Sequence, residues 1–311
     1  AGDWTNNGGV FTPNSSVVSF TNTAGAQSIN GTNAAQTFNS ITVAKTAQTL
    51  SVGGSTTSLT LNGSMLLTSG TLTAGTASIN VAGNWTNDGA TFTFVLFSPS
   101  TVTFNGGGAQ NINGTATSET FNNFTVNKGG GTLTVGGSIT SLSIFGNVTL
   151  TAGTFAAGTA TAIGLSSGNW TNNGGVFTPN SSVVSFTNPV GGQSIDGTNA
   201  SQTFNSITVT KNSQTLSGAG NLQVLTLNGT LLLATGIFAA GTATNINVAG
   251  DWINNSATFT PGTSTVTFSG GGAQNLGGAV ATASFNNFIV NKGGGTLTVF
   301  LSLTTLTVGG N

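Results

Sequence analysis

The sequence contains no cysteine, histidine, arginine or tyrosine, and charged residues make up only 3% of its 311 residues. Without cysteine there is no disulfide framework and no thiolate chemistry. Without histidine the chain lacks the most common general base. Four lysines and a net charge of −1 form no basic patch, so we expect no nucleic-acid partner. The low net charge also gives little self-repulsion, which favours association.

Long apolar runs are also missing. None approaches the ~18–20 residues that cross a membrane as a helix, so we expect no membrane-spanning segment. The chain begins at Ala1 without a signal-peptide pattern, and we interpret it as a processed or excised mature segment. Disorder is not expected, because disordered chains are poor in the aromatic and β-branched residues that recur here.

The sequence is instead rich in repetition. A Gly-Asx-Trp motif occurs four times and contains every tryptophan of the chain. A self-similar period of this size indicates an array of stacked units, in which we expect like residues to meet along a common axis. We therefore predict one continuous body over residues 1–311, with internal repeats at approximately 1–81, 82–166, 167–248 and 249–311, the last of them truncated. The motif tryptophans are Trp4, Trp85, Trp170 and Trp252, whose successive positions differ by 81, 85 and 82.

Short apolar segments recur within each repeat and alternate with small hydroxyl residues, as in Val18-Ser19-Phe20. This period of two predicts half-buried strands, and no window shows a helical stripe. Sandwiches or barrels would need linkers and charged edges, which the sequence lacks. We therefore predict an all-β, right-handed parallel β-helix (β-solenoid) of about four ~20-residue coils per ~82-residue repeat, or roughly 15 coils, although three longer coils remain an alternative. One strand of each repeat begins at Phe38, Phe121, Phe204 or Phe285.

The charged residues follow the repeat. We interpret the lysines as solvated residues at a strand-end turn that block lateral sheet pairing. The alternative is a row of cations that binds an anionic surface. They occupy one equivalent position in each repeat: Lys45, Lys128, Lys211 and Lys292.

The five acids are Asp3, Asp88, Glu119, Asp196 and Asp251. Each of the four aspartates is matched in other repeats by asparagine. A general acid or a metal ligand cannot be exchanged for an amide and keep its chemistry. We therefore expect no catalytic residue, no metal site and no cofactor, and a protein that is not an enzyme.

Two binding hypotheses remain open. The tryptophans could stack on sugars in a carbohydrate- or surface-binding module, although we favour a structural role in which each indole packs over a corner and its N–H is hydrogen-bonded. Thr-x-Thr pairs such as Thr71–Thr73 and Thr101–Thr103 raise a remote ice-binding alternative. Because these pairs occupy different positions of the repeat, we expect that they form no continuous plane.

The fourth repeat stops early, on a β segment without a charged or helical cap. A bare solenoid end exposes unpaired backbone groups. One interpretation is an end-to-end interface with a second copy of the chain, and the other is a chain cut from a longer protein. The expected interface residues are Ala1, Gly2, Asp3, Leu303, Leu306 and Val308.

Two segments carry a resemblance to a known family. The run Phe-Asn-Asn-Phe-Thr-Val-Asn-Lys-Gly-Gly-Gly at 121–131 and the run Gly-Asn-Trp-Thr-Asn-Asn-Gly-Gly-Val-Phe-Thr-Pro at 168–179 resemble repeats of large secreted bacterial surface proteins of the filamentous-adhesin type. The resemblance implies a β-solenoid in an extracellular bacterial setting, as a subunit of a self-assembling filament or the stalk of a surface adhesin. It transfers no catalytic or binding residue.

Overall fold

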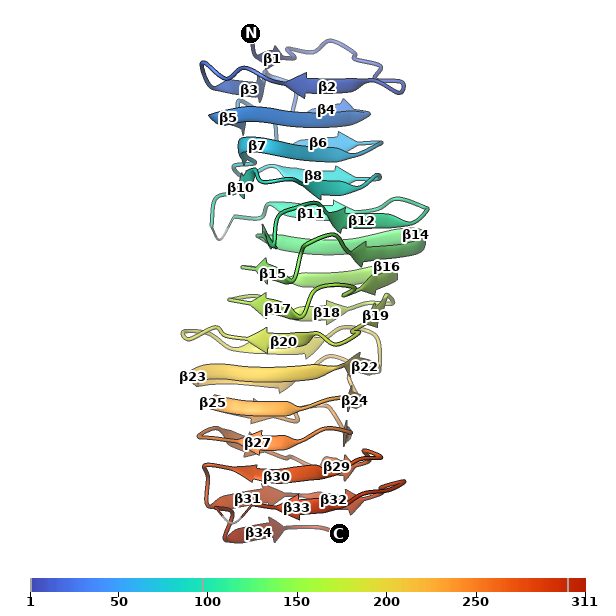
Figure 1. Cartoon of the computed structure of the whole chain (residues 1–311), viewed down its shortest axis with the longest axis vertical. Helices are drawn as coiled ribbons and strands as arrows, with labels where there is room; N and C mark the ends of the chain where they lie inside the picture. Colours follow the sequence, from blue (N-terminus) through green and yellow to red (C-terminus); the bar gives the residue numbers. More distant parts are fainter. Residues whose placement is uncertain (1, 97, 301) are drawn as a thin grey trace. The chain divides into compact units, whose positions relative to one another are not determined.

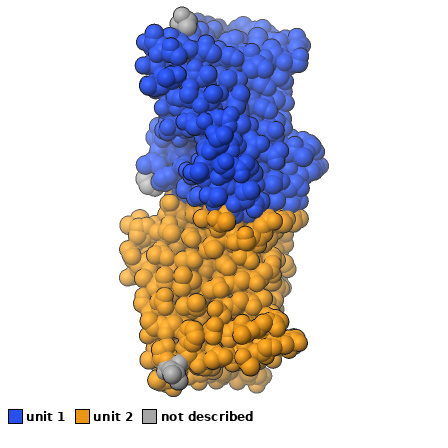
Figure 2. Space-filling model, viewed as in Figure 1, with its two compact units in different colours: residues 1–160 blue, residues 161–311 orange. Residues whose placement is uncertain are grey.

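The computed structural model describes residues 2–96, 98–300 and 302–311. The described chain contains only strands, turns and bends, and its strands pair in parallel. It forms two compact units, residues 1–160 and 161–311, which Figure 2 colours blue and orange. The predicted all-β β-solenoid is confirmed, with about 13 turns in all.

Unit 1 is built from short strands separated by turns rich in glycine and asparagine (Figure 1). Its strands are β1 (Trp4–Thr5), β2 (Val17–Phe20), β3 (Gln27–Asn30), β4 (Ala35–Phe38), β5 (Ser40–Val52), β6 (Ser58–Leu61), β7 (Met65–Thr73), β8 (Ser78–Val81), β9 (Trp85–Asn87), β10 (Thr91–Thr93), β11 (Thr101–Phe104), β12 (Gln110–Asn113), β13 (Ser118–Phe121), β14 (Asn123–Val135), β15 (Ser141–Ile144) and β16 (Val148–Ala156).

Unit 2 has the same construction. Its strands are β17 (Ala162–Leu165), β18 (Trp170–Asn172), β19 (Val176–Thr178), β20 (Val183–Phe186), β21 (Gln193–Asp196), β22 (Ser201–Phe204), β23 (Ser206–Gly218), β24 (Val224–Leu227), β25 (Leu231–Ala239), β26 (Asn245–Val248), β27 (Trp252–Asn254), β28 (Thr258–Thr260), β29 (Thr265–Phe268), β30 (Gln274–Gly278), β31 (Thr282–Phe285), β32 (Asn287–Val290), β33 (Leu297–Val299) and β34 (Thr305–Val308).

Alternation of side chains produces the core. In β6, Leu59 and Leu61 are buried while Ser58 and Thr60 are half-buried. Successive strand residues point to opposite sides, so each Leu-x-Leu or Val-x-Phe segment places both large side chains inside the coil. The core of each unit is therefore a stack of aliphatic and aromatic layers, one per turn.

Turn length varies along the stack. Met65 pairs with Trp85, and Trp85 pairs with Ile112, so the second of these turns is clearly longer than the first. The turns are longer on average than expected, which is why the chain makes about 13 of them, fewer than predicted. In unit 1 the pairings place residues in several columns, three of which run through Trp4, Ile29 and Val52; through Val18, Ile41, Met65, Trp85, Ile112 and Val135; and through Gln36, Leu59, Ile79, Val102, Phe124 and Val148.

Equivalent residues of successive repeats do not stack on each other, contrary to expectation. In unit 1, Trp4 and Trp85 belong to different columns. In unit 2, Trp170 pairs with Ile195, whereas Trp252 lies between Leu231 and Leu276 in another column. A repeat therefore does not contain a whole number of turns. Large apolar residues still meet along a column, although they come from different positions of the repeat.

The offset between repeats and turns also bears on the Thr-x-Thr pairs, which we expected to share no plane because they occupy different positions of the repeat. Thr71 and Thr73 pair in register with Thr91 and Thr93 of the next turn. Thr49 and Ser51 precede them in the same columns. Hydroxyl pairs from different positions of the repeat therefore share a surface over three turns of unit 1.

Among the glycines required by a close backbone approach, one occupies an equivalent position in all four repeats. Gly114 has φ of +127°, and a Cβ built on it would lie 2.0 Å from the carbonyl oxygen of Asn87 in the preceding turn. A side chain there would have to displace the main chain of its neighbour. The equivalent glycines are Gly31, Gly197 and Gly278, which approach Asn6, Asn172 and Asn254.

We predict that Gly114→Ala lowers the free energy of unfolding by about 3 kcal/mol, because the methyl group meets main chain and the φ is strained. Thermal unfolding followed by circular dichroism measures it. Gly107→Ala is the matched control, since nothing lies within 4 Å of its Cβ position. Equal midpoints for the two variants would contradict this close packing of turns.

Candidate functional site

Each tryptophan lies in a cluster with two phenylalanines. The ring centroid of Trp85 lies 5.0 Å from that of Phe92 and 5.5 Å from that of Phe121. Trp85 is 0% exposed, and the indole is part of the core instead of covering a corner. The four clusters are Trp4–Phe11–Phe38, Trp85–Phe92–Phe121, Trp170–Phe177–Phe204 and Trp252–Phe259–Phe285.

The expected hydrogen bond of the indole N–H occurs at Trp4, whose Nε1 donates to Oε1 of Gln36 over 3.3 Å. At Trp170, Nε1 is buried and has no partner at normal hydrogen-bond geometry within the described chain, so the expectation was wrong there. At Trp85 the N–H lies near the Glu119 carboxyl but does not reach normal hydrogen-bond geometry. A buried N–H without a partner costs free energy, so these positions need an explanation in terms of their surroundings.

A slot opens beside the cluster of the second repeat. Strand β10 pairs with β7, and β13 pairs with β15. Strands β10 and β13 lie beside each other, but no ladder joins them among the described strands. The slot between them has a volume of about 190 Å³. It is lined by Asn87, Ala90, Thr91, Phe92, Ser118, Glu119 and Thr120.

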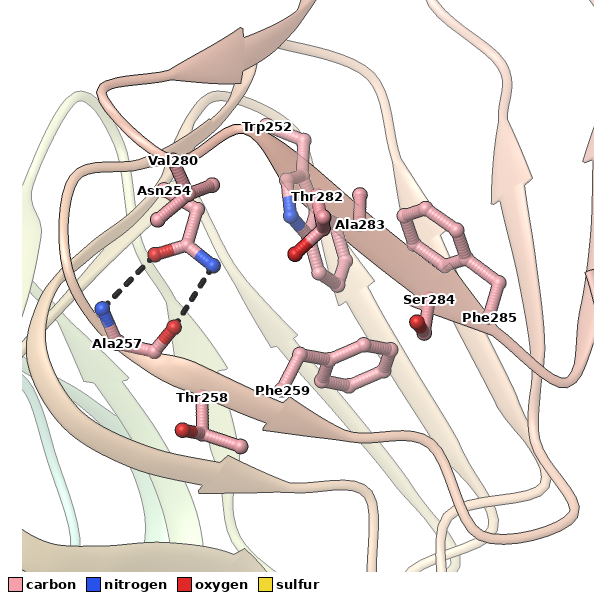
Figure 3. Close-up of a pocket in the computed structure, with 10 residues that line it drawn as sticks. All are labelled: Trp252, Asn254, Ala257, Thr258, Phe259, Val280, Thr282, Ala283, Ser284 and Phe285. Carbon is pink, nitrogen blue, oxygen red and sulfur yellow. Dashed lines mark hydrogen bonds between the residues drawn. The ribbon is translucent and has the colours of Figure 1, made fainter. Parts of the chain in front are cut away.

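The slot recurs in other repeats. In the first repeat it has a volume of about 190 Å³ and is lined by Phe11 and Gln36, among others. In the fourth it has about 180 Å³, and Figure 3 shows Phe259 and the hydroxyls of Thr258, Thr282 and Ser284 around it. At one slot position the repeats differ in charge and polarity: Gln36, Glu119, Gln202 and Ala283 are equivalent in the four repeats.

The slot asparagine is structural. Oδ1 of Asn254 accepts a hydrogen bond from the backbone N–H of Ala257 at 2.9 Å, and its Nδ2 donates to the carbonyl of the same residue at 2.9 Å (Figure 3). Asn87 holds Ala90 in the same way. The amide is therefore occupied in forming the turn, and the chemical character of each slot is set by the variable position.

Glu119 is a buried carboxyl group in the second slot. It is 2% exposed, and burial raises its pKa to about 7, while N–H groups of Asn87, Trp85 and the Thr120 backbone act in the opposite direction. These groups are near enough to favour the carboxylate, yet Oε1 of Glu119 has no partner at normal hydrogen-bond geometry in the described chain. The sequence pattern alone did not single out Glu119. Its alignment with Gln36 and Gln202 was the available signal, since glutamine has the same shape without the charge.

The pKa of Glu119 predicts a pH-dependent stability. Because this pKa is higher in the folded protein than the ordinary value of 4.5, the folded state binds the proton more tightly. The contribution of protonated Glu119 to the free energy of unfolding is complete below about pH 4.5 and is lost as the pH rises through about 7. The difference between the two pKa values corresponds to at most about 3 kcal/mol. Glu119→Gln should remove the dependence, as measured by denaturation at pH 5 and pH 8.5; equal pH dependence of both proteins would refute the assignment.

The lysines form a second recurring arrangement, and the prediction that they are solvated is wrong. Lys45, Lys128 and Lys211 are at most 1% exposed. Nζ of Lys211 donates to the carbonyls of Asn188 and Gly191 at 3.2 and 3.0 Å, and to Oε1 of Gln193 at 2.8 Å. Every lysine bonds to a glutamine that precedes it by the same distance in the sequence: Lys45 to Gln27, Lys128 to Gln110, Lys211 to Gln193 and Lys292 to Gln274.

The glutamine carries this connection to a third segment. Nε2 of Gln193 donates to the carbonyl of Gly168 at 2.7 Å, next to the tryptophan motif. One lysine and one glutamine thus tie the motif, a glycine-rich loop and the lysine strand together. Burial lowers the pKa of Lys211 to about 8. These ammonium groups are used inside the fold, which argues against a cationic binding surface.

We predict that Lys211→Met lowers the free energy of unfolding by about 3 kcal/mol, because three buried or partly buried oxygens lose their donor. Chemical denaturation of the full chain reports the change. Lys292→Met is the comparison, since Lys292 is only half-buried and should cost less. A wild-type midpoint for Lys211→Met would show that these hydrogen bonds contribute nothing to stability.

The aspartates act as hydrogen-bond acceptors in turns. Oδ1 of Asp251 accepts the backbone N–H of Asn275 at 2.7 Å, and Oδ1 of Asn84 accepts that of Asn111 at 2.9 Å. A carboxylate and an amide oxygen serve equally well in this role, which explains why the repeats exchange them. Among the described residues, no three metal-ligating side chains gather.

The last coil of unit 2 is incompletely covered. Val290, Leu306 and Val308 are 52%, 39% and 39% exposed. Their equivalents in the preceding repeat, Val209, Leu225 and Leu227, are 0%, 2% and 0% exposed. Of the other expected interface residues, Leu303 is buried, Gly2 and Asp3 are exposed, and Ala1 lies outside the described residues.

Comparisons of the chain with protein-family models, with curated proteins and with solved structures found no match. In the part of the chain that the structure describes, no helix is long and apolar enough to cross a membrane. Inferences about function therefore depend on the chain's own geometry.

Proposed function

We propose that this chain is a structural component of an extracellular filament or surface stalk that is built from stacked solenoid turns. The observation that carries the proposal is the exposure of Val290, Leu306 and Val308, whose equivalents inside the stack are buried. Solenoid stability is a sum of like interfaces between neighbouring turns, so a following turn would bury these side chains and pair the free strand edges.

The polar residues support a structural role. The lysines are bonded to glutamine and backbone carbonyls, and Asp3 and Asp251 accept backbone N–H groups. Such groups hold turns together and are not arranged for a reaction. We place the protein outside the cell because its repeats resemble those of filamentous adhesins.

The two binding alternatives receive less support. Trp85, Trp170 and Trp252 are at most 1% exposed, so their rings offer no surface for stacking on sugars. The hydroxyl surface of unit 1 covers three turns, and Thr73 and Thr93 are hydrogen-bonded to each other at 2.9 Å. A short, internally bonded array favours a role in holding turns together over ice binding.

We predict that the purified chain assembles end to end, because association buries the last coil. The double variant Leu306→Lys/Val308→Lys should shift the protein to monomer, as measured by analytical ultracentrifugation and electron microscopy. Val190→Lys is the control, since Val190 is 85% exposed on a loop away from the last coil. A wild-type chain that stays monomeric at every concentration would contradict the filament subunit and favour the stalk.

A further inference from the structure

We propose that an apolar patch found only in the second repeat is a lateral contact surface for a second copy of this chain. The patch consists of Phe94, Val95, Leu96 and Phe145, all of which belong to unit 1. The inference rests on the proposed filament or stalk for its setting, and it adds a side-to-side partner to the end-to-end association described above.

The loop that carries most of the patch is an addition to the repeat. After β10, the six residues 94–99 separate Thr93 from Ser100, and they begin with Phe-Val-Leu-Phe. Phe97, within this run, lies outside the described residues. In the other repeats only three residues fill the equivalent place, and they are polar or turn-forming: Pro-Asn-Ser at 13–15 and at 179–181, and Pro-Gly-Thr at 261–263.

A second difference in the sequence lies beside this loop in space. The ring centroids of Phe94 and Phe145 are 5.8 Å apart, with an interplanar angle of 68°. Together with Phe92 and Leu96 they line a groove of about 230 Å³. The aromatic pair is specific to the second repeat, because the equivalents of Phe145 are Asn62, Asn228 and Gly309.

The loop presents its apolar side chains to solvent. Val95 and Leu96 are 51% and 50% exposed. The backbone N–H of Val95 donates to the carbonyl of Gly75 at 3.0 Å, and the N–H of Ser98 donates to the carbonyl of Val95 at 3.2 Å, so hydrogen bonds hold the loop in place. Single exposed apolar residues are ordinary on protein surfaces, but a cluster of them around a groove marks an interaction site.

The size of the patch selects a multivalent partner. An interface that holds two single chains together buries ~800 Å² on each partner, more than these four side chains supply. Small contacts are effective when many act together, since linking them raises the overall affinity by ~10²–10⁴. A filament or a group of stalks presents the patch once per chain, and a second copy has the same spacing. A copy of this chain therefore engages all the patches at once.

The chemistry of the patch is also complementary to itself. In a two-fold contact both copies present the same residues, so apolar side chains meet apolar side chains and leave water together. The groove has only the hydroxyls of Thr93 and Thr120 as polar side-chain groups among its described lining residues. The net charge of −1 adds little repulsion between copies.

The test removes end-to-end assembly and supplies multivalency by other means. The full chain with Leu306→Lys/Val308→Lys is attached to beads through a C-terminal affinity tag, and clumping of the beads is measured by light scattering. We expect these beads to clump. Adding Leu96→Asp should reduce clumping at least tenfold, because a carboxylate would be buried in the contact without a partner.

Two further proteins on the same background complete the test. Replacement of residues 94–99 by Pro-Asn-Ser, together with Phe145→Asn, gives the second repeat the residues of the first and should also abolish clumping. Val190→Asp is the matched control, since Val190 is 85% exposed in unit 2 and the same charge there should leave clumping unchanged. Circular dichroism checks that each variant is folded.

Three results would overturn the proposal: beads that stay dispersed with the patch intact, equal clumping with Leu96→Asp, or equal loss of clumping with Val190→Asp. Beads with the intact patch should also fail to capture Leu96→Asp beads, and efficient capture would place the partner surface elsewhere on the chain. The bead assay does not require filaments. Failure of the lateral contact is thus distinguished from failure of end-to-end assembly, which is measured on the wild-type chain.

Discussion

The structure depends on parallel pairing between successive turns of one chain. Most strands bond to the strand about one turn before and to the strand about one turn after, and this pairing determines which side chains meet in the core. Where the pairing holds, large apolar residues lie in continuous columns and small hydroxyl residues lie outside. Beside the tryptophan motif of the second repeat, β10 and β13 lie next to each other without a ladder, and a slot opens next to an aromatic cluster. The slot is thus part of the stack of turns itself.

The rarity of charge has a physical explanation in this arrangement. In a narrow solenoid every turn has a core, and a charged side chain must either point outward or be bonded inside. The lysines follow the second course, with glutamine and backbone carbonyls as partners. Most acids follow the first, as acceptors for turn N–H groups. Glu119 is the buried acid, and N–H groups of Asn87, Trp85 and the Thr120 backbone lie around its carboxyl group.

Much of the fold could be predicted from sequence. Alternation in segments such as Ser58–Leu61 identified strands, and the tryptophan spacing identified an array. A repeat does not contain a whole number of turns, and this offset could not be predicted from the sequence. It depends on the lengths of the loops, whereas the apolar pattern indicates only the strands. The burial of Lys211 was also missed, since its partner Gln193 lies on another strand and polar pairs leave no periodic signal. The environment of Glu119 required the tertiary packing, although its glutamine equivalents were visible.

The central claim is that consecutive turns pair in parallel and in the stated register, and paired cysteines test it most directly. The chain has no cysteine of its own, and Thr60 pairs with Asn80, which in turn pairs with Thr103. Mild oxidation of the folded double variant Thr60→Cys/Asn80→Cys should give an intramolecular disulfide, because adjacent strands lie within its reach. Thr60→Cys/Thr103→Cys, two turns apart, should remain reduced. Equal oxidation of both pairs, or oxidation of the second alone, would contradict the stacking of turns described for this protein.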